Sequence, residues 1–383
     1  MGKSEQSGLL PLDTQTLLSR AKPCELGDRE LLTFSRLSSF RNCQRIDYYR
    51  NNLKIVPINA NDTAMRFGTL MHTAWEKYYN GEPVEKIIQE MGSELQDGNP
   101  TPNPENMQPE SRKFYNLGSA IMRAYAGKYP IENSPFKAVA TEFQFLGEIY
   151  SPFAKNRCRN RDFAIGGKVD GIVMDYATGH YYILEHKTAT TIDRGYLDKL
   201  WSDSQIALYA VMIEQILGIK IAGIIYDIAT KPGVRQKFGE TDTEFEKRKM
   251  DAETEGKNPN RLKQAIAETD VDFCERLTEK LQEPGAFHRE MIPIETFQKE
   301  KLTEELWHWI ALLKKARKTG VYLRNTSQCY GLFGKMPCQY LDVCRSGDAQ
   351  HVIESFYKQK GSHSELGGFV NDLEPGGDAL EAF

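Results

Sequence analysis

The feature that most constrains this chain is a change in hydrophobic period near residue 141. Before it, three segments carry apolar side chains at helical spacing: 35–49, 64–90 and 111–128. After it, three segments alternate like strands or are rich in β-branched and aromatic residues: 141–149, 163–176 and 181–187. Further elements are expected as helices over 203–217 and 296–318 and a strand over 221–228. This order predicts an α/β fold in which helices flank a mixed β-sheet.

The composition is that of a soluble globular protein. Hydrophobic residues make up 40% of the 383 residues and charged residues 27%. No apolar run is long enough to cross a bilayer, and the first residues lack the apolar centre of a secretory signal. We therefore expect a cytoplasmic protein with no membrane contact.

Shifts in composition divide the chain into a central domain and two peripheral segments. Residues 1–34 are weakly patterned and are expected to form a loose arm, whereas 35–345 carry the periodic elements. Within the domain, 231–264 hold dense alternating charge with Gly, Asn and Pro, which predicts a solvated insertion. The C-terminal segment 346–383 ends in an acidic, Gly-rich tail that is expected to be disordered. This tail is either a solubilising terminus or a recruitment peptide for a protein partner.

The net charge of −4 neither supports nor excludes nucleic-acid binding. Residues 361–383 contain five acids and no Lys or Arg, so residues 1–360 carry 49 basic and 48 acidic side chains. A nearly neutral body binds DNA only through a local basic groove, because phosphate neutralisation depends on clustered Lys and Arg.

Two carboxylates and one lysine converge on the predicted hairpin. Glu185 and Lys187 lie two apart on one strand and share a face, whereas His186 points away from it. The antiparallel neighbour brings Asp170 beside Glu185. Paired carboxylates share a small site at low cost only when a cation bridges them, and oxygen ligands favour Mg²⁺ or Mn²⁺. The set therefore suits phosphodiester hydrolysis, although a surface ion pair at a hairpin would show the same three residues.

Two further pairs flank this constellation. Gly68 precedes His72 by four residues on the upstream helix, and Gln205 precedes Tyr209 by four residues on the downstream helix. An imidazole can complete an oxygen-rich metal shell, and residues at i and i+4 share one helix face. Taken alone, each pair is also what an amphipathic helix packed on its sheet would carry.

In this order, GxxxH, GxxD, ExK and QxxxY resemble the RecB-like exonuclease branch of the PD-(D/E)xK nuclease superfamily over about residues 35–345. The resemblance implies a restriction-endonuclease-like fold. It also implies a site in which His72, Asp170, Glu185 and the backbone carbonyl of His186 bind divalent metal. Catalytic roles would fall to Asp170, Glu185 and Lys187, with Gln205 and Tyr209 beside them.

Two nearby residues qualify this resemblance. Val169 stands where the family name has Pro, a departure that is common in this branch. Glu142, on the preceding strand, is either an accessory acid or a satisfied edge-strand residue, and we favour the second interpretation.

Three of the seven cysteines crowd near the C-terminus, at Cys329, Cys338 and Cys344. Such clustering in a reducing compartment is typical of metal or cluster ligation, and Cys43 is the obvious fourth thiolate. Its surroundings, Phe40-Arg-Asn-Cys43, also resemble the opening segment of the same nucleases. The iron–sulfur subset of that family implies a [4Fe–4S] cluster that joins the N- and C-terminal segments of the domain.

The cysteine pattern departs from the family in two ways. The eight-residue spacing after Cys329 is longer than usual, and Gln44 replaces a proline. Zinc and unliganded thiols remain alternatives. The other cysteines are expected to be ordinary thiols: Cys24, Cys158 and Cys274.

The resulting expectation is a metal-dependent exonuclease that acts on single-stranded or duplex DNA ends in recombination, repair, phage DNA processing or CRISPR adaptation. The alternatives are an endonuclease of the same fold and a catalytically inactive DNA-binding or scaffold protein. A GxxxxGK[ST] phosphate loop does not occur in the sequence, so we expect no ATP-driven motor in this chain.

Overall fold

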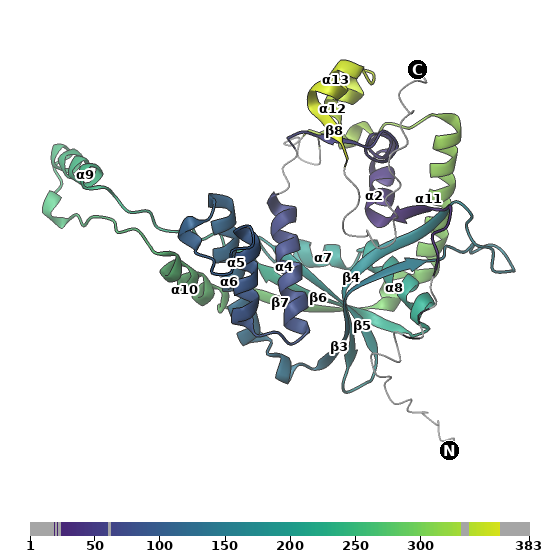
Figure 1. Ribbon diagram of the computed structural model, residues 1–383, viewed down its shortest axis with the longest axis horizontal. Helices are drawn as coiled ribbons and strands as arrows, with labels where there is room; N and C mark the ends of the chain where they lie inside the picture. The colour runs from purple at the N-terminus through teal and green to yellow at the C-terminus, as the bar shows by residue number, and fades with distance from the viewer. Residues whose placement is uncertain (1–18, 20, 22–23, 60–62, 331–336, 361–383) are drawn as a thin grey trace.

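The computed structural model describes residues 19, 21, 24–59, 63–330 and 337–360. A six-stranded mixed sheet lies at the centre (Figure 1). Its strands are β1 (Glu30–Thr33), β3 (Phe136–Gly147), β4 (Phe163–Asp175), β5 (Tyr181–Ala189), β6 (Ile221–Thr230) and β7 (Phe287–Pro293). A small second sheet pairs β2 (Ile55–Pro57) with β8 (Tyr357–Gln359) in antiparallel register.

Strand β4 organises the main sheet, because three strands pair with it. β3 runs antiparallel along one of its edges. The other edge is shared by β1, which is parallel, and β5, which is antiparallel. The sheet then continues through a parallel β5–β6 pair and an antiparallel β6–β7 pair.

Helices cover both faces of the sheet. One face packs against α2 (Phe34–Asn42), α8 (Ser204–Leu217) and α11 (Lys299–Thr319) in the largest apolar cluster. The other packs against a group formed by α4 (Thr63–Tyr79), α5 (Val84–Leu95), α6 (Pro109–Lys128) and α10 (Asp270–Leu281). Shorter elements connect them: α3 (Gln44–Asp47), η1 (Tyr48–Asn52), η2 (Pro104–Asn106), η3 (Ile131–Asn133), α7 (Arg194–Leu200), η4 (Pro259–Arg261), η5 (Ile294–Phe297) and η6 (Thr326–Gln328). The predicted mixed sheet flanked by helices is confirmed.

Two local expectations need correction. Residues 30–33, assigned to a loose arm over 1–34, form β1, and Leu32 is completely buried against the sheet. The pairing partner is β4, about 130 residues away, so no local pattern announces it. The helical stretch 64–90 is two helices, because Gly81 adopts a positive φ of 87° and Pro83 precedes α5.

The charged insertion projects from the body between the end of β6 and the start of α10 (Figure 1). It contains a helix that was not expected, α9 (Asp242–Thr254). Thr241 and Glu244 form a capping box at its start, a signal that the sequence carries.

The C-terminal elements of the described chain pack on residues that follow α2. In Figure 1 the yellow C-terminal elements, α12 (Leu341–Arg345), α13 (Gln350–Phe356) and β8, lie next to purple N-terminal ones. Asp348 accepts hydrogen bonds from Arg45 at 2.6 Å and Tyr49 at 2.5 Å. Tyr340 Oη donates to the carbonyl of Ile55 at 2.9 Å. The acidic tail 361–383 and most of the eight residues between Cys329 and Cys338 lie outside the described residues.

None of the helices in the described part of the chain is both long and apolar enough to cross a membrane.

Candidate metal centre

Asp170 lies at a gap in the pairing of β4. On one edge of this strand, pairing with β1 ends at Gly166 and pairing with β5 begins at Gly171. The carboxylate of Asp170 turns into this gap, where its Oδ2 accepts a hydrogen bond from the backbone N–H of His186 at 2.7 Å. The backbones of β4 and β5 therefore separate at Asp170. The backbone N–H of His186 donates to the Asp170 carboxylate there, in place of a backbone carbonyl of β4.

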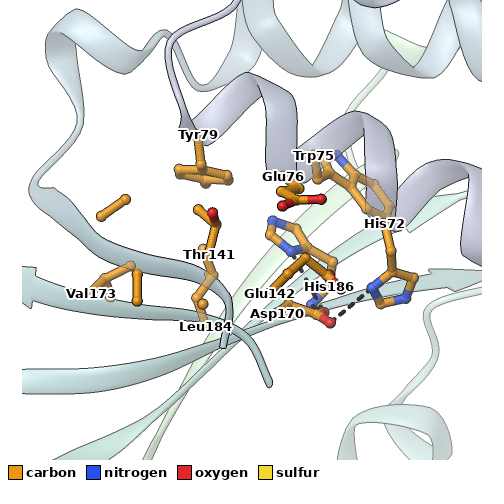
Figure 2. Close-up of a pocket in the computed structure, with 13 residues that line it drawn as sticks. His72, Trp75, Glu76, Tyr79, Thr141, Glu142, Asp170, Val173, Leu184 and His186 are labelled. Atoms are coloured by element: carbon orange, nitrogen blue, oxygen red, sulfur yellow. Dashed lines mark hydrogen bonds and ion pairs between the residues drawn. The ribbon is translucent and has the colours of Figure 1, made fainter. Parts of the chain in front are cut away.

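Helix α4 brings an imidazole to the same spot. His72 Nδ1 lies 2.9 Å from Asp170 Oδ1. The residues at helical spacing with it, Trp75, Glu76 and Tyr79, line one pocket together with Asp170 and others. Figure 2 shows these α4 side chains pointing towards the strands that carry Glu142, Asp170 and His186.

Glu142 completes a group of three potential ligands. One donor atom from each of His72, Glu142 and Asp170 lies within 4.8 Å of the other two. Glu142 has a positive φ of 46° in β3, and it lies between the residues that pair with Val169 and Gly171. A non-glycine residue in this conformation is strained, and such strain concentrates at functional sites.

Glu142 lies on β3, which among the described strands pairs only with β4, and it forms an ion pair with Lys168 of β4. The expectation that Glu142 is an edge-strand residue with its charge satisfied therefore holds in part. The sequence did not reveal that it faces His72 and Asp170. Its neighbours Thr141 and Phe143 pair in regular register with Gly171 and Val169, and no local signal in the sequence announces the positive φ between them.

Glu185 and Lys187 form a hydrogen-bonded pair on β5, with Lys187 Nζ 2.6 Å from Glu185 Oε1. Burial and the nearby charge of Asp170 raise the pKa of Glu185 to about 7, although Lys187 acts in the opposite direction. Burial lowers the pKa of Lys187, but the Glu185 carboxylate outweighs it and leaves the pKa above its ordinary value. Lys187 is therefore a cation at neutral pH.

Hydrogen bonds keep Asp170 ionised. Burial alone would raise the pKa of Asp170, but hydrogen bonding to His186 and His72 outweighs it, and the pKa falls below its usual range. The same contact with Asp170 raises the pKa of His72 against the effect of its burial. Asp170 and Glu185 thus form an acidic pair in which burial first, and the charge of Asp170 second, raise the pKa of Glu185, and a bound cation would favour the charged form.

Helix α8 places Gln205 and Tyr209 against the same sheet. Tyr209 is hydrogen-bonded to Gln205, and burial together with the charge of Glu185 raises its pKa to about 12. Its ring packs so closely on β4 that a Cβ added to Gly167 would lie 2.6 Å from Tyr209 Cζ. This contact gives a physical reason for the glycine of the GxxD motif, because Tyr209 of α8 lies directly against the backbone of Gly167.

The residues predicted for the site come to one part of the sheet, but Glu185, Lys187, Gln205 and Tyr209 do not line the pocket below α4. His72, Asp170 and His186 line one pocket, and Glu185 is close enough to influence both Asp170 and Tyr209. Carboxylate and imidazole donors of this kind fit a hard divalent ion such as Mg²⁺ or Mn²⁺.

The four predicted cysteine ligands line a different pocket. Cys43 comes from the start of α3, and Cys329, Cys338 and Cys344 come from the C-terminal elements. The backbone N–H of Asn325 points at Cys43 Sγ, 3.4 Å away, and that of Cys338 donates to the carbonyl of Cys329 at 2.7 Å. Burial raises the pKa of the Cys338 thiol, and the other three thiols add to the effect.

The spacing of these thiols bears on what they can hold. Among the described residues, no three of the cysteine sulfurs lie within 4.8 Å of one another. A tetrahedral zinc ion needs sulfurs about 3.8 Å apart, given a Zn–S bond of about 2.3 Å. The remaining three cysteines lie elsewhere: Cys24 beside Glu148, Cys158 exposed, and Cys274 buried beside Asn116.

Comparison with known proteins identifies a family whose model matches most of the chain. The model of the PD-(D/E)XK nuclease superfamily matches residues 31–345. No curated protein matches the chain. Among solved structures, Rai1 of Scheffersomyces stipitis, in complex with (3′-NADP)⁺ and calcium ion, is 12% identical, with 78% of this chain and 83% of that chain covered. Its TM-score of 0.14 supports neither a shared fold nor a shared activity.

Proposed function

The chain belongs to the PD-(D/E)XK nuclease superfamily, and from this premise we propose that it is a DNA exonuclease of the RecB-like branch. It hydrolyses phosphodiester bonds from DNA ends with a divalent metal at Asp170. The observation that carries the proposal is the meeting of the four sequence motifs, from α4, β4, β5 and α8, around one buried acidic pair.

The ligands of the metal are drawn from one small set. His72, Asp170, Glu185 and the carbonyl of His186 would hold Mg²⁺ or Mn²⁺. Glu142, whose carboxylate lies within 4.8 Å of donor atoms of His72 and Asp170, would be a further ligand. A bound divalent ion polarises the phosphate, lowers the pKa of a water molecule and stabilises the leaving oxygen.

The remaining side chains have distinct tasks. Because Lys187 is cationic, it stabilises the negative charge that develops on the phosphate rather than removing a proton. In addition to its place among the metal ligands, His72 is hydrogen-bonded through Nδ1 to Asp170 Oδ1, which keeps these two ligands together. Tyr209, bonded to Gln205, packs on β4 beside Glu185 and organises that side of the site.

The exonuclease assignment rests on the paired GxxxH and QxxxY motifs, which resemble those of end-acting members of the family. The test is digestion of end-labelled linear DNA and covalently closed circular DNA by wild type and Lys187→Ala, with Mg²⁺, Mn²⁺ or EDTA. The proposal expects metal-dependent loss of label from linear DNA, intact circles and an inactive variant. Cleaved circles would make the protein an endonuclease, and an absence of cleavage with every metal would favour a DNA-binding or scaffold role.

We further propose that Cys43, Cys329, Cys338 and Cys344 hold a [4Fe–4S] cluster. The four thiols line one cavity, and their sulfurs are spread more widely than one zinc ion requires. The cluster would be structural, since it would link the start of the domain to its end and reduce the entropy of the unfolded chain. Protein purified without oxygen should be brown and contain iron, whereas a colourless protein with stoichiometric zinc would refute the cluster.

A further inference from the structure

His186 is held by its side chain as well as by its backbone. Its imidazole faces α4, is 2% exposed and stacks on Trp75, with ring centroids 4.8 Å apart and planes 13° apart. Tyr79 and Tyr125 close the pocket with centroids 5.4 Å and 6.4 Å away. The backbone N–H of this residue is the donor that fixes Asp170 Oδ2, so any motion of the His186 peptide moves the carboxylate.

Asp227 is the neighbour of His186 in the parallel β5–β6 ladder. It is 1% exposed, and its Oδ2 accepts hydrogen bonds from Arg289 at 2.5 Å and from Tyr125. Tyr79 Oη lies 3.5 Å from the same oxygen. Because both Asp227 and His186 contact these tyrosines, their side chains lie on the same face of the sheet.

Each of the two residues also has one buried polar atom without a hydrogen-bond partner among the described residues. These atoms are Nε2 of His186 and Oδ1 of Asp227. An imidazole nitrogen and a carboxylate oxygen are complementary, and buried polar groups seldom stay unsatisfied. A small rotation of either side chain would allow a direct hydrogen bond between the two atoms, and one bridging water molecule would also satisfy both.

We propose that Asp227, held by Arg289, Tyr79 and Tyr125, anchors the imidazole of His186 and thereby positions Asp170 for the metal. Asp227 is a positioning residue, since it acts through His186 and does not line the pocket. The inference rests on the proposed metal site and adds its outer support, because carboxylates that orient the groups around a metal affect its affinity.

The test is a Mn²⁺ titration of the metal-free protein, read as free Mn²⁺ by electron paramagnetic resonance. Asp227→Asn should weaken Mn²⁺ binding roughly 10–100-fold, the range typical of such outer carboxylates. The matched control is Asp270→Asn. Asp270 is also buried and paired with an arginine, and it accepts hydrogen bonds from Arg112, Asn116 and Gln236. The control should lower the melting temperature and leave Mn²⁺ affinity unchanged.

A second pair of variants tests the link to Nε2 even where Asp227→Asn does not fold. The amide nitrogen of Gln takes the place of imidazole Nε2, and that of Asn the place of Nδ1. His186→Gln should therefore retain more Mn²⁺ affinity than His186→Asn.

Two results would overturn the inference while leaving the nuclease assignment intact. One is wild-type Mn²⁺ affinity in folded Asp227→Asn, and the other is equal or better binding by His186→Asn than by His186→Gln. Failure of wild type to bind Mn²⁺, or full binding by Asp170→Asn, would instead remove the metal site itself and this inference with it.

Discussion

Gly167→Ala tests whether α8 and β4 meet as closely as the site requires. A methyl group at this position would lie 2.6 Å from Tyr209 Cζ and 2.8 Å from Phe145 Cζ. Non-bonded carbon atoms prefer separations of about 3.5–4.0 Å, so the tyrosine ring must retreat by about 1 Å. Tyr209 is 5% exposed, and the core around it leaves little room for that movement.

The expected magnitudes follow from this displacement. Overpacking of a filled core costs about 1–3 kcal/mol, which should lower the melting temperature by several degrees. A shift of about 1 Å in a residue beside the reacting groups can reduce the rate by about 100-fold. We therefore expect Gly167→Ala to lose more activity than its folded fraction explains, in thermal melting and initial-rate assays on linear DNA.

Gly171→Ala is the matched control on the same strand, because a methyl there would lie 3.4 Å from Leu184 Cβ, an ordinary contact. Replacement of Tyr209 by Leu in the Gly167→Ala background should recover the lost stability but not the activity. Wild-type melting and wild-type rates for Gly167→Ala would refute the close packing of Tyr209 on β4.

Three further predictions concern separate parts of the chain. Burial beside Asp170 raises the pKa of Glu185 to about 7, so a metal ion must displace a proton below that pH; Mn²⁺ affinity should rise between about pH 6 and pH 8 more steeply in wild type than in Glu185→Gln, in which only the titration of His72 remains. A methyl at Gly68 would meet nothing within 4 Å, so Gly68→Ala should raise the free energy of unfolding by about 0.5–1 kcal/mol, and a lower melting temperature would contradict the described α4. Cys338→Ala should release iron and lower the melting temperature more than it changes the rate per folded molecule, whereas the exposed Cys158→Ala should change neither.

The part of the fold that the sequence predicts is local in origin. The β4–β5 hairpin, α8 and β6 follow from period and turn residues within about 70 residues of one another. Gly167 can be recognised in the sequence as part of the GxxD motif, but the sequence does not show why glycine is needed at this position. It becomes clear only when Tyr209, 42 positions later, packs onto it.

The rest of the site depends on pairing between distant segments. The gap at Asp170 exists because β1 and β5 share one edge of β4, and β1 lies about 130 residues upstream. The strained backbone of Glu142 lies within the pairing of β3 with β4. Asp227 sits in an unbroken apolar strand, and only the β5–β6 register brings it beside His186. None of these relations leaves a local pattern in the sequence.

The most direct test of the metal centre is anomalous diffraction from crystals of the protein soaked with Mn²⁺. A peak bounded by the carboxylate of Asp170, with donors from among His72, Glu142 and Glu185, would agree with the site described above. A peak elsewhere, together with Mn²⁺-dependent DNA cleavage that survives Asp170→Asn, would show that the catalytic centre lies in another part of the molecule.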